Sequence, residues 1–421
     1  MRKQVIPGSF SLMKKMNISL ILNTIREKGC VSRAEIAKIT GLTPATVTNI
    51  TAELIKYKLI LEAERGQSNG GRKPVMLRIN SQGYYVIGIY IGSKGVEIIV
   101  ANLNSDIIYS DNLNIDSSIP SEVILDGIKK KISRWMNINK GKQILGIGVG
   151  IHGLVQSRDG ISIYGPNLGW ENVPVKDTLE SALKVPVFID NDVRTMTLGE
   201  SWFGLAKDIT NFIFIYVGYG IGGSIVIDNQ LYRGISEGAG EIGHTTIECN
   251  GPKCSCGNYG CLQALASEKA MVDEVKKLLS DGKKSVIKSW VNDDLCRISP
   301  EIVFEAAIKN DDLALTVIKE KARYLGVGIA NLINTFNPSL VIINGQITKL
   351  GDTIMDCIQQ EVNKRSMKYL QNSTNITFSF LGQDAVLKGT VALVLGETFN
   401  NPELVYSSKQ FKKDCENNKK I

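Results

Sequence analysis

The sequence predicts an α/β protein in which a small N-terminal winged helix-turn-helix precedes a larger, two-lobed body. Three observations support this fold class. After a loose arm at residues 1–12, short helices with clear start and stop signals lead into two short strands. Beyond residue 80, buried strands alternate with helices as far as residue 399. Between residues 244 and 261, one histidine and several cysteines crowd a single glycine-rich loop.

The helices at the N-terminus carry strong capping signals. A first helix with one apolar stripe ends near residue 28. Ser32 and Glu35 have the spacing of a capping box, and the helix that they begin stops at Gly41. Thr43 caps a third helix, and Pro44 occupies its first position, where a missing N–H costs little. These signals predict a helix-turn-helix.

A basic loop follows this helix-turn-helix. Strands at 59–61 and 75–77 flank the flexible loop 64–74, which has the arrangement of a wing. The second helix of such a pair enters the major groove, and arginine on a wing suits a narrow minor groove. The alternative is a small helical packing module with a solvated loop. We favour DNA binding and expect contacts from Arg33, Thr43, Ala45, Thr46, Thr48, Asn49, Arg72 and Lys73.

The charge of the chain agrees with a nucleic-acid partner for the N-terminal segment. Residues 1–80 hold 14 basic and 5 acidic residues, a net charge of +9, so the rest of the chain sums to −2 of the total +7. A basic block on a nearly neutral chain favours a polyanion such as DNA.

The body is predicted to alternate strands and helices, and its composition is that of an ordinary globular protein. Expected strands lie at 84–91, 96–100, 145–151, 185–189, 212–217 and 340–345, and expected helices at 121–135, 265–280, 300–332 and 389–399. We expect a winged helix-turn-helix domain at 1–80, a first lobe at 81–200, a second lobe at 201–399 whose last helix packs back on the body, and a disordered basic tail at 400–421.

Composition also indicates the cell compartment in which the protein is expected. The chain has no run of eighteen apolar residues and no N-terminal apolar block with a cleavage site, so we expect neither a membrane span nor a signal peptide. Four of the eight cysteines crowd one loop, a pattern that suits metal binding in a reducing cytoplasm better than disulfides.

The cysteine loop predicts a structural zinc site. His244, Cys254, Cys256 and Cys261 offer one nitrogen and three sulfurs, the donors that zinc favours in closed tetrahedral sites. Intervening glycines let the backbone turn sharply between the thiols. The alternative is a loop that is merely rich in cysteine. Cys249 lies in the same loop without an assigned role.

These motifs together resemble the ROK family of repressors, open reading frames and sugar kinases. A winged helix is followed by Gly-Glu-x-Gly-His at 240–244 and Cys-x-Cys-Gly-x-x-Gly-Cys at 254–261, and the resemblance spans about 15–398. Within the family, segments 68–77 and 250–258 are similar to the xylose repressors of Gram-positive bacteria.

The resemblance implies an actin-like (RNase H-like) body with a sugar cleft between its lobes. Taken singly, each polar residue would be an ordinary cap or surface turn, whereas as a set they suit the fixed donors and acceptors of a sugar. Asp192 matches the catalytic base of the kinases, and Gln263 replaces a sugar-binding glutamate. The implied sugar-binding residues are Asn167, Asn191, Asp192, Glu241, His244 and Gln263.

Two departures from the kinases argue against catalysis. Tyr90 stands where the first phosphate loop has an aspartate, and Tyr219 replaces the threonine of the second phosphate loop. Phosphoryl transfer depends on holding the phosphates and their Mg²⁺, so we expect no ATP cofactor and no catalytic residues.

The leading hypothesis is a repressor of a xylose-utilisation operon. It would bind an inverted-repeat operator as a homodimer or higher oligomer, and free xylose in the cleft would release it. One alternative is a repressor that responds to another sugar or a sugar phosphate, which the amide of Gln263 makes credible. A less favoured alternative is an ATP-dependent sugar kinase with a DNA-binding domain.

Overall fold

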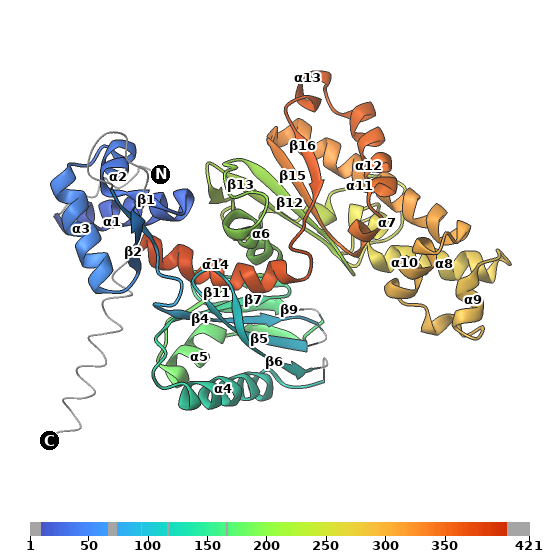
Figure 1. Cartoon of the computed structure of the whole chain (residues 1–421). Coiled ribbons are helices and arrows are strands. Elements are labelled where there is room, and N and C mark those ends of the chain that lie inside the picture. The colour runs from blue at the N-terminus through green and yellow to red at the C-terminus, as the bar shows by residue number, and fades with distance from the viewer. Residues whose placement is uncertain (1–9, 66–73, 94, 116–117, 166, 402–421) are drawn as a thin grey trace. The chain divides into compact units, whose positions relative to one another are not determined.

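The computed structural model describes residues 10–65, 74–93, 95–115, 118–165 and 167–401 (Figure 1). These residues form two compact units. One unit is the segment Glu200–Ala385, which we call the second lobe. The other contains the described residues on either side of it, namely the head (residues 10–79) and the first lobe (residues 80–199 and 386–401). Each is described in turn.

The head is a winged helix-turn-helix. Its elements are α1 (Phe10–Lys28), β1 (Val31–Ser32), α2 (Arg33–Thr40), α3 (Pro44–Lys56), β2 (Ile60–Arg65) and β3 (Val75–Ile79), and its strands pair in the order β1-β3-β2. The capping box of Ser32 and Glu35 is present, and Thr43 caps α3. Gly41 ends α2 with a φ of 70°, a left-handed conformation that favours glycine. The predicted caps are therefore confirmed.

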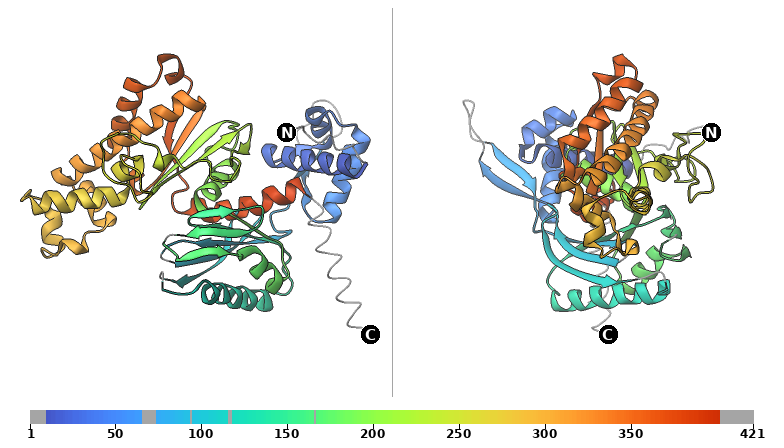
Figure 2. Two further views of the ribbon diagram at one scale, coloured as in Figure 1. Left: turned by 180° about the vertical axis from the view of Figure 1, so that it is seen from behind. Right: turned by 90° about the vertical axis from the view of Figure 1, so that its right-hand side faces the viewer.

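The first lobe is built on a sheet with the strand order β11-β7-β4-β5-β6, in which β11, β7 and β4 are parallel. Helices α4 and α5 cover one face, and α14 covers the other (Figures 1 and 2). Its elements are β4 (Tyr85–Ile91), β5 (Gly95–Asn102), β6 (Ile107–Asn114), α4 (Ser121–Ile138), β7 (Ile144–Ile151), β8 (Leu154–Gln156), β9 (Ile161–Gly165), β10 (Trp170–Val173), α5 (Val175–Leu183), β11 (Val187–Asn191), α6 (Asp192–Phe203, which runs on into the second lobe) and α14 (Asp384–Asn400).

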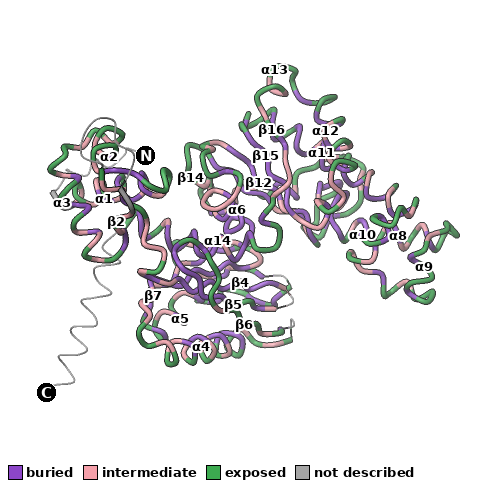
Figure 3. Tube along the Cα trace, in the orientation of Figure 1, coloured by how far each residue is buried: buried purple, intermediate pink, exposed green. Residues whose placement is uncertain are grey.

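Glycines on one face of β4 and β7 decide where the last helix lies. Gly88, Gly146 and Gly148 point toward α14, and a Cβ at Gly148 would lie 2.0 Å from the carbonyl oxygen of Thr390. The backbone of α14 can therefore rest directly on these buried strands (Figure 3). As a result, residues 386–401 group with the first lobe.

This contact yields a testable expectation. Gly148→Ala should lower the free energy of unfolding by about 1–3 kcal/mol, because the new methyl group must displace backbone of α14. Urea-induced unfolding would measure the change. Gly141→Ala is the matched control, since its Cβ would meet nothing within 4 Å. Equal stability of the two variants would contradict this account of α14.

The second lobe has a sheet with the order β14-β13-β12-β15-β16, packed against long helices. Its elements are β12 (Phe212–Val217), β13 (Ile221–Ile227), β14 (Gln230–Leu231), η1 (Ile242–His244), α7 (Leu262–Ala266), α8 (Glu268–Ser280), α9 (Val286–Trp290), η2 (Leu295–Arg297), α10 (Pro300–Ile308), α11 (Asp312–Phe336), β15 (Leu340–Gly345), η3 (Gln346–Leu350), α12 (Asp352–Arg365), α13 (Lys368–Gln371) and β16 (Asn375–Phe378).

Two helices that we expected to be continuous are broken in the second lobe. The expected helix 265–280 is divided at Ser267, whose hydroxyl caps α8 by accepting from the N–H of Ala270. The expected helix 300–332 is divided before Asp311, which caps α11 in the same way. Within the described part of the chain, no helix has the length and apolar character needed to cross a membrane.

Candidate functional site

A polar cluster lies at the carboxyl end of two parallel strands of the first lobe. His152 directly follows β7, Asn191 ends β11, and Asp192 begins α6. Nδ1 of His152 lies 3.0 Å from Oδ2 of Asp192, while Nδ2 of Asn191 donates to Oδ1 of Asp192 at 2.9 Å. Carboxyl ends of parallel strands are where α/β sheets usually bind ligands. This edge is therefore a candidate binding site.

Asn167, on the turn between β9 and β10, completes this cluster. Its Nδ2 lies 3.3 Å from Nε2 of His152. We call His152, Asn167, Asn191 and Asp192 the first-lobe cluster. The structure thus brings together the three predicted sugar residues of this lobe and adds His152, which the sequence analysis missed. Its place at the end of a predicted buried strand was the available signal.

The carboxylate of Asp192 determines the electrostatics of this cluster. Its side chain is only 6% exposed, against 35% for His152. Its hydrogen bond to the imidazole raises the pKa of His152, against the opposing effect of burial. Oδ1 of Asp192 also accepts from the N–H of Val193 at 2.9 Å. Both carboxylate oxygens are therefore engaged by the protein.

A buried ion pair lies directly beside the cluster. Nε of Arg194 donates to Oδ1 of Asp190 at 2.5 Å, and one of its terminal nitrogens donates to the carbonyl oxygen of Val155 at 3.0 Å. Both charged side chains are almost fully buried. Because Asp190 belongs to β11 and Arg194 to α6, the pair fixes the start of the helix that carries Asp192.

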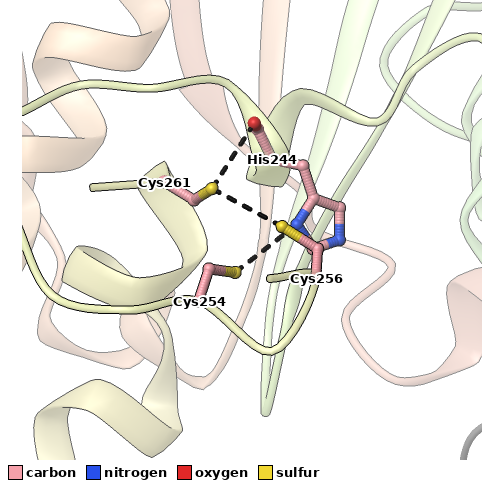
Figure 4. Close-up of side chains that lie close together, drawn as sticks. All are labelled: His244, Cys254, Cys256 and Cys261. Atoms are coloured by element: carbon pink, nitrogen blue, oxygen red, sulfur yellow. Dashed lines mark hydrogen bonds between the residues drawn. The ribbon is translucent and has the colours of Figure 1, made fainter. Parts of the chain in front are cut away.

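The second lobe holds a candidate metal centre (Figure 4). Ligand atoms of His244, Cys254, Cys256 and Cys261 all lie within 4.8 Å of one another. Nδ1 of His244 is 3.6 Å from the sulfur of Cys254, and the sulfurs of Cys256 and Cys261 are 3.8 Å apart. A tetrahedral ion with metal–sulfur bonds of about 2.3 Å places neighbouring sulfurs about 3.8 Å apart. The four residues therefore fit a metal ion.

The backbone of the loop explains this convergence. Short bridges pair Thr246 with Cys261 and Lys253 with Tyr259, which folds the loop back on itself. Gly260 has a φ of 64°, and a Cβ there would lie 1.6 Å from the carbonyl oxygen of Glu248. Burial raises the pKa of the Cys261 thiol to about 12. A bound metal ion would replace that proton.

The other predicted sugar residues also lie in the second lobe. Oε2 of Glu241, an exposed carboxylate, is 4.0 Å from Nε2 of His244, so the imidazole presents Nδ1 to the sulfurs and Nε2 to Glu241. Gln263 contacts protein at both ends of its amide. Its Oε1 accepts from the N–H of Ile221 at 3.0 Å, and its Nε2 donates to Oγ of Ser255 at 3.3 Å. Gln263 therefore joins the turn after β12 to the metal loop.

The predicted DNA contacts fall into four groups. Ala45, Thr48 and Asn49 are exposed near the start of α3, whereas Thr43 and Thr46 bond to each other at the helix cap. Arg33 is half-buried, and its guanidinium donates to Thr51 at 3.1 Å and to the exposed Glu62 at 2.9 Å. Arg72 and Lys73 lie outside the described residues.

Comparisons with known proteins agree with this architecture. The profile described as "ROK family" matches residues 86–397, and one described as "Winged helix-turn-helix DNA-binding" matches residues 17–60. A xylose repressor of Caldicellulosiruptor bescii is 37% identical over 400 residues, covering 94% of this chain and 99% of that protein.

Two solved structures resemble this chain, one over nearly its whole length and the other over about three quarters of it. The crystal structure of a ROK family transcriptional regulator, a homologue of the E. coli MLC protein, superposes with a TM-score of 0.83 at 28% identity, covering 94% of this chain and 98% of that chain. A ROK family glucokinase from Streptomyces griseus, in complex with glucose and AMPPNP, superposes with a TM-score of 0.65 at 27% identity, covering 73% of this chain and 98% of that chain.

Proposed function

Because this chain belongs to the ROK family, we propose that it is a transcriptional repressor whose body binds a sugar and whose head binds operator DNA. The observation that carries the proposal is the combination, in one chain, of an exposed polar face on α3 with the first-lobe cluster. Sugar binding would favour a conformation with lower affinity for the operator. The head would read an inverted repeat as part of a homodimer or higher oligomer.

The inducer is proposed to be free xylose. Similarity to a xylose repressor over nearly the whole chain supports this assignment. The first-lobe cluster also favours an uncharged sugar, because it contains no lysine or arginine, and Arg194 beside it is already paired with Asp190. A sugar phosphate would need a cation that is free to bind it.

A panel of free sugars and sugar phosphates tests this assignment by thermal shift. A ligand that binds only the folded chain raises its melting temperature, so xylose should give the largest rise. A larger rise with a different sugar, or with a sugar phosphate, would favour the alternative repressor and would overturn xylose as the inducer.

A sugar kinase is the second candidate, and the glucokinase likeness favours it. Two departures from the kinases argue against it: by the resemblance, Tyr90 stands where their first phosphate loop has an aspartate, and Tyr219 stands where their second has a threonine. ATP-dependent phosphorylation of any pentose or hexose would reinstate the kinase.

The metal ion is proposed to be zinc in a structural role. The donor set of three thiols and one imidazole matches closed zinc sites, which keep no position open for substrate. Held through Nδ1, the ring of His244 would keep Nε2 beside Glu241. Zinc would thus fix the orientation of two proposed sugar contacts without taking part in chemistry.

DNA reading by α3 can be tested with Asn49→Ala. Asparagine on a recognition helix reads adenine by two hydrogen bonds, so we expect about tenfold weaker binding to a selected operator duplex, as measured by fluorescence anisotropy. The salt dependence should not change, since Asn49 carries no charge. Asn137→Ala, at an exposed position of α4, is the control. Unchanged affinity of Asn49→Ala would remove Asn49 from the interface.

A further inference from the structure

The orientation of the imidazole of His152 is set by Asp192. The carboxylate can only accept, so the neutral ring must carry its proton on Nδ1 to make the 3.0 Å hydrogen bond. Asp192 is itself fixed, because its other oxygen accepts from Asn191 and from the N–H of Val193. The lone pair of the neutral ring is therefore on Nε2, which points away from Asp192.

Nε2 of His152 lies next to a second polar group that is already a predicted sugar contact. Nδ2 of Asn167 is 3.3 Å away, at the long end of the hydrogen-bond range. The side chain of His152 is 35% exposed, so a ligand can reach it. A hydroxyl group both donates and accepts. A sugar hydroxyl that takes the place of this weak contact can therefore donate to Nε2 and accept from Nδ2 at the same time.

From this geometry we propose that His152 is a sugar-binding residue, and that its Nε2 accepts a hydrogen bond from a sugar hydroxyl that Asn167 also contacts. The inference rests on the proposed function, since it adds a contact to that sugar site. The ligand class is an uncharged sugar. Asp192 acts in this arrangement as the group that holds the tautomer of His152, a role in which its carboxylate stays buried.

Two substitutions separate sugar contact from a purely structural role. In His152→Asn the amide reaches the place of Nδ1, so the bond to Asp192 can remain while the group at Nε2 is lost. In His152→Gln the amide reaches the place of Nε2, and the bond to Asp192 is lost instead. We expect the dissociation constant for the sugar, measured by calorimetry, to rise about tenfold or more in His152→Asn and clearly less in His152→Gln.

The opposite ranking of these two variants would overturn the proposal, because it would show that His152 only holds Asp192. A sugar affinity of His152→Asn equal to that of the unaltered protein would also overturn it. Melting temperatures measured without sugar show whether each variant is folded. If either variant does not fold, the ring itself can be observed in the unaltered protein.

The chain has two histidines, which makes that observation simple. At a pH high enough to keep the ring neutral, protein labelled with ¹⁵N-histidine should show His152 with its proton on Nδ1, and saturating sugar should shift the Nε2 resonance. If the sugar raises the melting temperature but leaves Nε2 unmoved, only this inference fails. If no sugar in the panel raises the melting temperature, the proposed function fails and the inference fails with it.

Discussion

Replacing Cys261 with serine should abolish stoichiometric zinc binding and lower the stability of the chain by more than about 4 kcal/mol. Cys261 is fully buried, and its sulfur lies 3.8 Å from that of Cys256. Without it, the remaining ligands cannot complete a closed tetrahedral site, and the loop loses the bonds that hold it together. Metal analysis of the purified protein and its melting temperature would measure both effects.

Cys249→Ser is the matched control for this prediction. Cys249 lies in the same loop but is exposed and stands outside the cluster of four ligands. Its substitution should leave both zinc content and melting temperature unchanged. Full zinc occupancy and an unaltered melting temperature in Cys261→Ser would show that the four-ligand site is assigned wrongly.

Breaking the buried ion pair of Asp190 and Arg194 is the second substitution that we expect to have a large effect on stability. Asp190→Leu should lower the free energy of unfolding, measured in urea, by about 3–5 kcal/mol. The reason is that it leaves the guanidinium of Arg194 buried and without its carboxylate. The loss of stability should be accompanied by weaker sugar binding, since the pair anchors the start of α6, where Asp192 lies.

The double variant Asp190→Leu with Arg194→Leu separates charge from shape. Because no uncompensated charge is then left inside the lobe, it should recover a substantial part of the lost stability. A double variant that is less stable than the single variant would mean that packing, rather than the buried charge, accounts for the effect.

Features encoded by neighbouring residues could be predicted from the sequence. The capping box of Ser32 and Glu35 and the left-handed Gly41 are local signals, and each is present in the structure. The convergence of the metal ligands was predictable for the same reason, since three of them lie between Cys254 and Cys261.

Features that depend on distant segments could not be predicted in this way. His152 pairs with a residue 40 positions away, so its place at the end of a predicted strand did not reveal which residue it would meet. The glycines of β7 can be recognised in the sequence, but the helix that occupies the space beside them comes more than 200 residues later. Arg33 was predicted as a DNA contact from its residue type, and its bonds to Thr51 and Glu62, 18 and 29 positions away, could not be predicted in this way.

The coupling between sugar and DNA can be measured most directly on a duplex selected from random sequence by the full-length protein. Its affinity, followed by fluorescence anisotropy, should fall at least tenfold when xylose reaches the concentration that saturates the rise in melting temperature. An affinity for the duplex that stays constant at that concentration would contradict the central claim, because the sugar would then bind without changing the affinity of the protein for DNA.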